Sequence, residues 1–329
     1  MLLRSMGLSL GLAVATLSGC TAMPEQAGAN CAEAAAVPWR SLAPGVWVWE
    51  GAQAEISANN RGHVAPTSLV VDGREAAVID PGPSFLHGER VRRSVACRFQ
   101  AQVRWVVNTH AHAENVLANS AFAGSNATTI VSGPATLAAM RKRCPACLAS
   151  LTTRVGEAAM AGTHIVWPTR PLKAGDELPV GRIRLRVMPF EQGHTEGDLV
   201  LWNPSERVVW AGGLAYLGRV PELSQGSLDG WLTALEHLDA LAPTHVVSAA
   251  VSTASSEGEL PKALRATRAY LSALRQGILQ AMDEGHQPQE PGLVSLPAYA
   301  GWAGYKERHS FNVQRAWREL EPVWMDRAR

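Results

Sequence analysis

Apolar and polar positions follow a period of two in several short segments, which predicts β-strands. A mostly apolar run over residues 103–107 has the length of a strand and ends at a polar pair. Over residues 182–187, arginine alternates with Ile, Leu and Val, as in a half-exposed strand. The apolar segments 199–202 and 208–210 flank an Asn-Pro-Ser-Glu turn sequence, and this arrangement predicts a hairpin.

Other segments have the period of an α-helix. Ser227 is suited to cap a helix with one apolar face, which comprises Leu228, Trp231, Leu232, Leu235 and Leu238. A second helix is predicted over residues 260–284, with Gly285 as its stop, and a third over residues 311–320. An earlier helix is expected over residues 135–142. Periodicity alone therefore indicates a mixed α/β protein.

Length and charge limit the classes of function. The chain has 329 residues, a formal net charge of +1 and no cluster of Lys and Arg, so the sequence gives no support to nucleic-acid binding. No linker composition or internal repeat divides the middle of the chain. We therefore expect a single domain over residues 41–329, with helices at its C-terminal end.

The first residues predict export. Arg4 is followed by an apolar run over residues 6–17 that is too short to span a membrane. The Leu-Ser-Gly-Cys sequence that ends at Cys20 resembles a bacterial lipobox, so residues 1–19 are expected to be a signal peptide and Cys20 the lipidated N-terminus. Thr after the Cys favours the outer membrane of a Gram-negative bacterium, with residues 20–40 as a tether in the periplasm. The alternative is an ordinary cleaved signal with an incidental Cys20.

The remaining cysteines are Cys31, Cys97, Cys144 and Cys147. An oxidising periplasm favours pairing, and we expect a local disulfide between Cys144 and Cys147, at the end of the helix over residues 135–142. Free thiols, redox catalysis and metal binding are the alternatives for this pair. A bond between Cys31 and Cys97 is possible, but the sequence leaves it open.

Two histidines follow the predicted strand over residues 103–107. His110 and His112 are at i and i+2 on extended chain, so both imidazoles point to the same side and can reach one metal ion. Glu114 and Asn115 come directly after them.

This stretch resembles the His-x-His-x-Asp-His signature of the metallo-β-lactamase superfamily, with Glu114 in place of its Asp and Asn115 in place of its third His. The Gly-His-Thr-Glu-Gly-Asp segment matches another motif of the family and makes His194 the third ligand of the first metal. Gly213 stands where the family has an Asp that bridges two metals, and Ala250 stands where it has a His. The resemblance therefore implies one zinc ion, bound by three histidines.

The resemblance extends from about residue 42 to about residue 321 and includes Asp80-Pro81-Gly82. It implies the family fold, a four-layer αββα sandwich. The chain is most similar to a periplasmic branch, the zinc metallohydrolases of quinoprotein relay or sulfur-oxidation systems, which shares the His-x-x-Asn-Val motif over residues 309–313. A quinoprotein dehydrogenase system is thus an expected context.

Three imidazoles would leave zinc a fourth position for a water molecule, whose pKa falls to about 7 in such sites. Glu114 could then act as general base, and the amide of Asn115 could donate to an oxyanion. Alternatively, both residues are only the polar start of a helix, where acids are favoured.

Two functional hypotheses follow. In the first, the protein is a single-zinc hydrolase of a small ester, thioester or lactone. In the second, it is an accessory lipoprotein that binds metal or ligand without turnover. The three histidines favour metal in both hypotheses, and a β-lactamase role rests on the family name alone.

Two further positions lie near these motifs. Trp47 and Trp49 are expected on one strand, where core packing is favoured over an aromatic wall beside the site. His63 follows an Asn-rich turn, and a role in substrate binding or in support of the metal ligands is left open for it.

Overall fold

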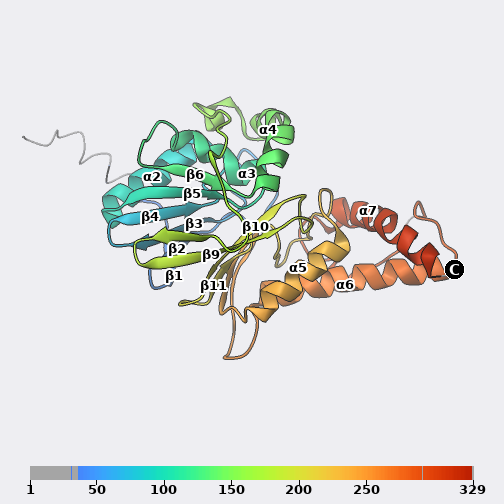
Figure 1. The fold of residues 1–329 in the computed structure, drawn as a ribbon. Coiled ribbons are helices and arrows are strands. Elements are labelled where there is room, and N and C mark those ends of the chain that lie inside the picture. Colours follow the sequence, from blue (N-terminus) through green and yellow to red (C-terminus); the bar gives the residue numbers. More distant parts are fainter. Residues whose placement is uncertain (1–30, 32–35, 291, 328–329) are drawn as a thin grey trace, which may run out of the picture.

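Two β-sheets form the centre of the molecule, as Figure 1 shows for the computed structural model, which describes residue 31, residues 36–290 and residues 292–327. The first sheet has the strand order β1-β2-β3-β4-β5-β6-β7. Its strands are β1 (Arg40–Ala43), β2 (Val46–Trp49), β3 (Thr67–Asp72), β4 (Glu75–Ile79), β5 (Gln102–Asn108), β6 (Thr129–Ser132) and β7 (Arg170–Pro171). Strands β1 to β4 are antiparallel, whereas β4 to β7 are parallel.

The second sheet has the order β13-β12-β11-β10-β9-β8. Its strands are β8 (Glu177–Val180), β9 (Ile183–Phe190), β10 (Asp198–Asn203), β11 (Val208–Trp210), β12 (His245–Val247) and β13 (Val251–Thr253). The predicted hairpin is confirmed, because β10 and β11 pair antiparallel. The inner faces of the two sheets share one buried apolar cluster, which includes Val107, Leu185 and Leu201.

Helices cover the outer face of each sheet (Figure 1). On the first sheet lie α2 (Phe85–Phe99), α3 (Ala113–Val116) and α4 (Pro134–Val155), and on the second α5 (Leu228–Ala240), α6 (Lys262–Asp283) and α7 (Tyr305–Asp326). Short 3₁₀ turns occupy Leu117–Ala121, Glu157–Met160 and Pro297–Tyr299. The core under α5 to α7 is built from their apolar faces, including Trp231, Leu271 and Trp317. The predicted four-layer αββα sandwich is confirmed.

The predicted helix signals are confirmed at α5 and α6. Ser227 caps α5, since its side chain accepts a hydrogen bond from the backbone N–H of Gly230. Gly285 follows α6 in the left-handed region at φ 80°, as a stop signal requires. Helix α7 is longer than predicted at both ends. Before residue 311 its one buried side chain is the polar His309, and after residue 320 it buries none, so a search for apolar periodicity does not detect these turns.

The structure corrects the predicted cysteine pairing. Cys144 and Cys147 are free, and the disulfide joins Cys31 to Cys97. The helix that was expected to end before Cys144 continues as α4 to Val155. Within it, Cys144 packs beside Met140 and Cys147 beside Leu151, so the two thiols belong to different clusters.

The N-terminal boundary of the domain also lies earlier than predicted. Val37 and Trp39 are buried, and the indole N–H of Trp39 donates to the hydroxyl of Ser94 at 2.9 Å. The end of the predicted tether therefore belongs to the folded domain. The predicted signal peptide and Cys20 lie outside the described residues.

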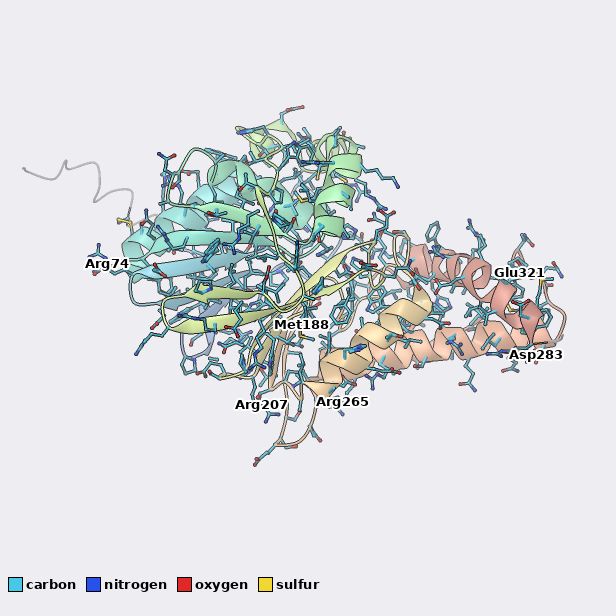
Figure 2. The ribbon with its side chains drawn as sticks, viewed as in Figure 1. Arg74, Met188, Arg207, Arg265, Asp283 and Glu321 are labelled. Carbon is cyan, nitrogen blue, oxygen red and sulfur yellow. A yellow bond between two sulfur atoms is a disulfide. The ribbon has the colours of Figure 1, made fainter. Side chains whose placement is uncertain are left out.

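Helices α6 and α7 extend away from the sandwich as a pair (Figure 1). Figure 2 places Asp283 and Glu321 in the outer part of this pair, on the opposite side of the molecule from Arg74. There the indole N–H of Trp324 donates to the carboxylate of Asp283 at 2.6 Å. Among the described residues, no helix is both long and apolar enough to cross a membrane.

Candidate metal centre

The loop that carries His110 and His112 begins where β5 ends. Because β4 and β5 are parallel, their carboxyl ends meet at the same edge of the sheet, and Asp80 after β4 lies beside Thr109 after β5. The carboxylate of Asp80 accepts hydrogen bonds from the backbone N–H of Thr109 at 2.9 Å and from its hydroxyl at 2.6 Å. Asp80 holds this position with φ 51°, a left-handed conformation that Asp tolerates better than most residues. It thereby fixes the start of the histidine loop.

His194 reaches the same place from the loop between β9 and β10. Asp198 closes this loop, because its carboxylate accepts from the backbone N–H of Thr195 at 3.0 Å and from its hydroxyl at 2.7 Å. The backbone N–H of Leu199 donates to the carbonyl of Thr109 at 2.7 Å and so ties this loop to the histidine loop of the other sheet. The two motifs singled out in the sequence therefore meet between the sheets.

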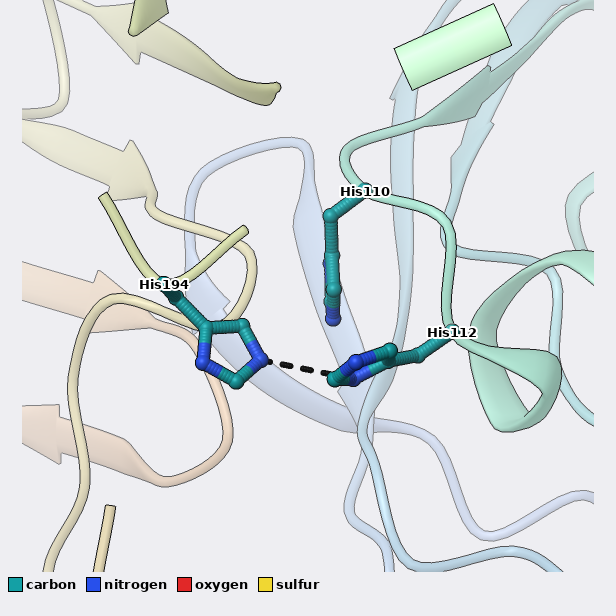
Figure 3. A group of neighbouring side chains, drawn as sticks. All are labelled: His110, His112 and His194. Atoms are coloured by element: carbon teal, nitrogen blue, oxygen red, sulfur yellow. Dashed lines mark hydrogen bonds between the residues drawn. The ribbon is translucent and has the colours of Figure 1, made fainter. Parts of the chain in front are cut away.

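The three predicted ligands come together, as Figure 3 shows. One nitrogen from each of His110, His112 and His194 lies within 4.8 Å of the others, and they are the one such group found among the described residues. His112 Nδ1 and His194 Nε2 are 3.3 Å apart. Two nitrogens that bind one tetrahedral zinc at about 2.1 Å would be about 3.4 Å apart, so this spacing fits a shared metal ion.

Hydrogen bonds orient two of these rings. His194 Nδ1 lies 3.0 Å from the carbonyl oxygen of Glu222, to which it must donate, so Nε2 is left without a proton. His110 Nδ1 lies 2.9 Å from the hydroxyl of Thr109, which already donates to Asp80 and therefore accepts from His110. Each ring thus has an unprotonated Nε2 whose lone pair can bind a metal ion, the arrangement that metal ligation requires.

Burial keeps these two histidines neutral. It is the largest cause that holds the pKa of His110 and of His194 well below the usual value, and the neighbouring imidazoles lower both further. A neutral imidazole is the form that binds metal. The chemistry, orientation and spacing of the donors therefore fit a divalent ion such as zinc.

Glu114 and Asn115 occupy different surroundings within α3. The carboxylate of Glu114 lines the cavity beside the histidines, with its Oε1 4.0 Å from His112 Nδ1. The side chain of Asn115 is buried and hydrogen-bonds to Asp80. The backbone carbonyl of Asn115 accepts a hydrogen bond from the backbone N–H of Gly82. Glu114 thus lies where a general base could act. The side chain of Asn115 instead bonds to Asp80, which fixes the start of the histidine loop. The catalytic role of either residue remains a prediction.

Gly213 and Ala250 stand where the family has ligands of a second metal, and the structure shows what surrounds each of them. Gly213 lies against His194, and a Cβ atom added to it would come within 2.0 Å of the imidazole Cδ2. Ala250 is buried, and its neighbour Ala249 rather than Ala250 lines the small cavity next to the histidines. That cavity has a volume of about 20 Å³, room for about one water molecule.

A larger cavity, of about 310 Å³, opens beside His112. Its walls include the charged side chains of Glu55, Glu114, Arg154, Arg219, Glu222 and Arg308. Apart from Glu114, these residues could not be predicted from the sequence, because they come from segments without a motif. One signal was available: residues 309–313 were noted as a motif, and Arg308 directly precedes it.

Trp47 and Trp49 are half-buried and pack against a buried apolar cluster of the first sheet, in agreement with the packing role expected for them. Trp47 meets Phe99 edge to face, with ring centroids 5.2 Å apart. Trp49 stacks on His87 at 4.2 Å, and His63 meets the same indole edge to face at 4.6 Å. Burial is the main cause that lowers the pKa of His63 to about 4, so this ring is an uncharged part of an aromatic cluster.

Comparisons with known proteins agree with this geometry. A family model described as the metallo-beta-lactamase superfamily matches residues 61–249, which include all three histidines. No curated protein sequence matches the chain.

Several solved structures have a similar fold. A metallo-beta-lactamase from Pontibacter korlensis aligns with a TM-score of 0.54 and 16% identity over 71% of this chain and 98% of that one. A metallo-beta-lactamase from Hirschia baltica aligns with a TM-score of 0.52 and 14% identity over 72% and 97%. The metallo-beta-lactamase FIM-1 from Pseudomonas aeruginosa, in its mono-zinc form, aligns with a TM-score of 0.53 and 16% identity over 72% and 94%.

Proposed function

The chain belongs to the metallo-beta-lactamase superfamily, and we propose that it is a hydrolase that uses one zinc ion held by His110, His112 and His194. The observation that carries this proposal is the orientation of the rings. The Nδ1 atoms of His110 and His194 hydrogen-bond to Thr109 and to the Glu222 carbonyl, so their Nε2 atoms are unprotonated and can bind a metal ion. A zinc ion bound there would supply an activated water and a polarised carbonyl group.

The chain's own residues would then do the rest of the work. Glu114 lines the cavity near His112, where its carboxylate can accept a proton from an attacking water. The cavity of about 310 Å³ has the size of a small-molecule site. A small ester, thioester or lactone is the substrate class that we propose for it.

A single metal is supported by what surrounds the histidines. Gly213 offers no ligand, and Asn115 is bonded to Asp80. The mono-zinc form of FIM-1 shows that a protein of similar fold can be isolated with one zinc ion.

A hydrolysis screen tests the proposal. The purified protein is stripped of metal with a chelator, restored with zinc, and assayed in both states against panels of esters, thioesters and lactones. We expect turnover that is lost on stripping and regained with zinc. If zinc binds but no panel member is hydrolysed, the accessory-protein hypothesis replaces the hydrolase.

We also propose that the protein is an exported lipoprotein of the periplasm, anchored in the outer membrane through Cys20. The disulfide between Cys31 and Cys97 supports an oxidising compartment. Cys20→Ser should remove the protein from the membrane fraction, while wild type found wholly in the soluble periplasm would refute the anchor. On the resemblance of its motifs alone, we propose a quinoprotein dehydrogenase system as its context.

A further inference from the structure

Two arginines line the cavity of about 310 Å³ beside His112, and each has a buried donor without a partner among the described residues. Arg219 lies on the loop between β11 and α5, and its Nε is unpaired. Arg308 lies in the first turn of α7, and its Nη1 is unpaired. A buried guanidinium N–H without a hydrogen bond is costly, so such a donor indicates a ligand that would accept from it.

Backbone contacts hold these two arginines in one unit. The N–H of Ala303 donates to the carbonyl of Gly218 at 2.9 Å, and the N–H of Val220 donates to the carbonyl of Ala303 at 3.0 Å. Arg219 is therefore clamped against the segment that leads into α7.

Asn312 extends the clamp by one turn of α7. Its amide donates to the carbonyl of Pro221 at 2.8 Å and accepts from the N–H of Leu223 at 3.1 Å. These bonds fix the loop of Arg219 relative to Arg308. The same loop contributes the Glu222 carbonyl that orients His194, so the arginines and the metal ligands share one support.

The charged side chains in the cavity wall balance, with three arginines against three glutamates, so a bound divalent ion would leave the site positive. Arg308 pairs with Glu55 at 2.6 Å and with Glu222 at 3.8 Å. Within the described part of the chain, no carboxylate forms an ion pair with Arg219, which lies over the ring of Tyr216 at 5.7 Å. Arg154 adds a third guanidinium, and a divalent ion on the histidines would add two more positive charges.

We propose that Arg219 and Arg308 bind a carboxylate group of the substrate, next to the bond that is hydrolysed. A guanidinium presents several N–H donors in a fixed plane, which suits a carboxylate. The substrate class is therefore an ester, thioester or lactone with a free carboxylate, and a neutral analogue lacks the group that these arginines bind. Helix α7, which carries Arg308, lies beyond residues 61–249, the region that the family model matches. The inference rests on the proposed hydrolase for its first test and is independent of it for its second.

The first test compares two esters of equal chain length, 4-nitrophenyl hexanoate and the mono-4-nitrophenyl ester of adipic acid. Wild type should have a higher kcat/KM for the carboxylated ester. Arg308→Met and Arg219→Met should each lower the ratio of the two kcat/KM values by roughly tenfold or more, the scale of a lost hydrogen bond to a charged group. Because the ratio is measured on one sample, partial unfolding of a variant does not change it.

Two matched variants sharpen this test. Glu55→Gln removes the carboxylate that pairs with Arg308 and should raise the ratio, the opposite sign to Arg308→Met. Arg318→Met removes an exposed arginine of the same helix, whose side chain bonds the carbonyl of Gln314, and should leave the ratio unchanged. An equal fall in both kcat/KM values for the two arginine variants, with the ratio intact, would overturn the inference while leaving the hydrolase in place.

The second test measures binding alone. Adipate should raise the Tm of the zinc-loaded wild type, and the double variant Arg219→Met/Arg308→Met should lose that increase. If neither ester is hydrolysed but this difference is seen, the carboxylate site stands and the proposed hydrolase falls. If adipate raises both Tm values equally, or neither, the carboxylate site is refuted.

Discussion

The two sides of the space between the sheets differ in what they offer a metal ion. On one side, His110, His112 and His194 converge. Thr109 orients the ring of His110, and the Glu222 carbonyl orients the ring of His194. On the other side lie Gly213 and Ala249, which have no ligand atom in their side chains. A metal site thus depends on the hydrogen bonds that support its ligands as much as on the identity of those ligands.

The ligand-poor side has also been closed by packing. The imidazole of His194 occupies the space that a side chain at position 213 would enter. The side chain of Asn115 hydrogen-bonds to Asp80, whose carboxylate also accepts a hydrogen bond from the hydroxyl of Thr109. A second metal would therefore need more than one replaced residue.

Removing one of the three histidines should have the largest effect, on the amount of bound zinc. His194→Ala should lose most of the bound zinc, because two imidazoles alone do not hold a tetrahedral site. Elemental analysis of protein purified without added metal measures the loss. His245→Ala serves as the control, since that ring bonds Thr253 at 3.0 Å on the edge of the second sheet and should keep its metal.

The next effect concerns the acid beside the histidines. Glu114→Gln should lower turnover by roughly 10²-fold, the usual scale for a lost general base, while zinc content stays unchanged. Steady-state kinetics on a substrate from the screen measure it, with Glu157→Gln, on a 3₁₀ turn after α4, as the matched control. Unchanged turnover would reduce Glu114 to an acid at a helix start.

Placing an acid at position 213, where the family has an Asp, tests whether a second zinc ion can bind there. Gly213→Asp should weaken zinc binding by roughly tenfold or more instead of adding a second ion, because its Cβ would displace His194, and loss of a ligand's support has effects of this size. Competition with a chelator measures the affinity. Two equivalents of zinc bound to this variant would contradict the view that the side is closed.

The smallest expected effect is on the free energy of unfolding, through the hydrogen bonds that support the histidine loop. Asn115→Ala should lower the free energy of unfolding of the metal-free protein by about 1–3 kcal/mol, because it leaves the buried Asp80 short of a hydrogen bond. Urea denaturation measures it. No change would mean that Asn115 is free for another role, such as donation to an oxyanion.

The sequence predicted correctly which three histidines come together, because His110 and His112 share one short loop and His194 lies in a motif that folds locally around Asp198. It failed where the outcome depends on distant packing. The continuation of α4 through Pro145 separated Cys144 from Cys147, and no local pattern predicted that helix end.

The charged cavity is a second example of what the sequence could not reveal. Arg219 and Arg308 are far apart along the chain, and they line one cavity because Asn312 and the Ala303 backbone join α7 to the loop after β11. A polar helix start such as that of α7 gives no apolar period from which this contact could be read.

We propose that the protein holds one metal ion, on the three histidines. The most direct test is the zinc content per chain of the wild-type protein, purified without added metal and measured again after dialysis against zinc. We expect about one equivalent in both samples, since three histidines form one site, whereas Gly213 and Ala250 offer no side-chain ligand for a second ion. Two tightly bound equivalents after dialysis, or none in either sample, would contradict it.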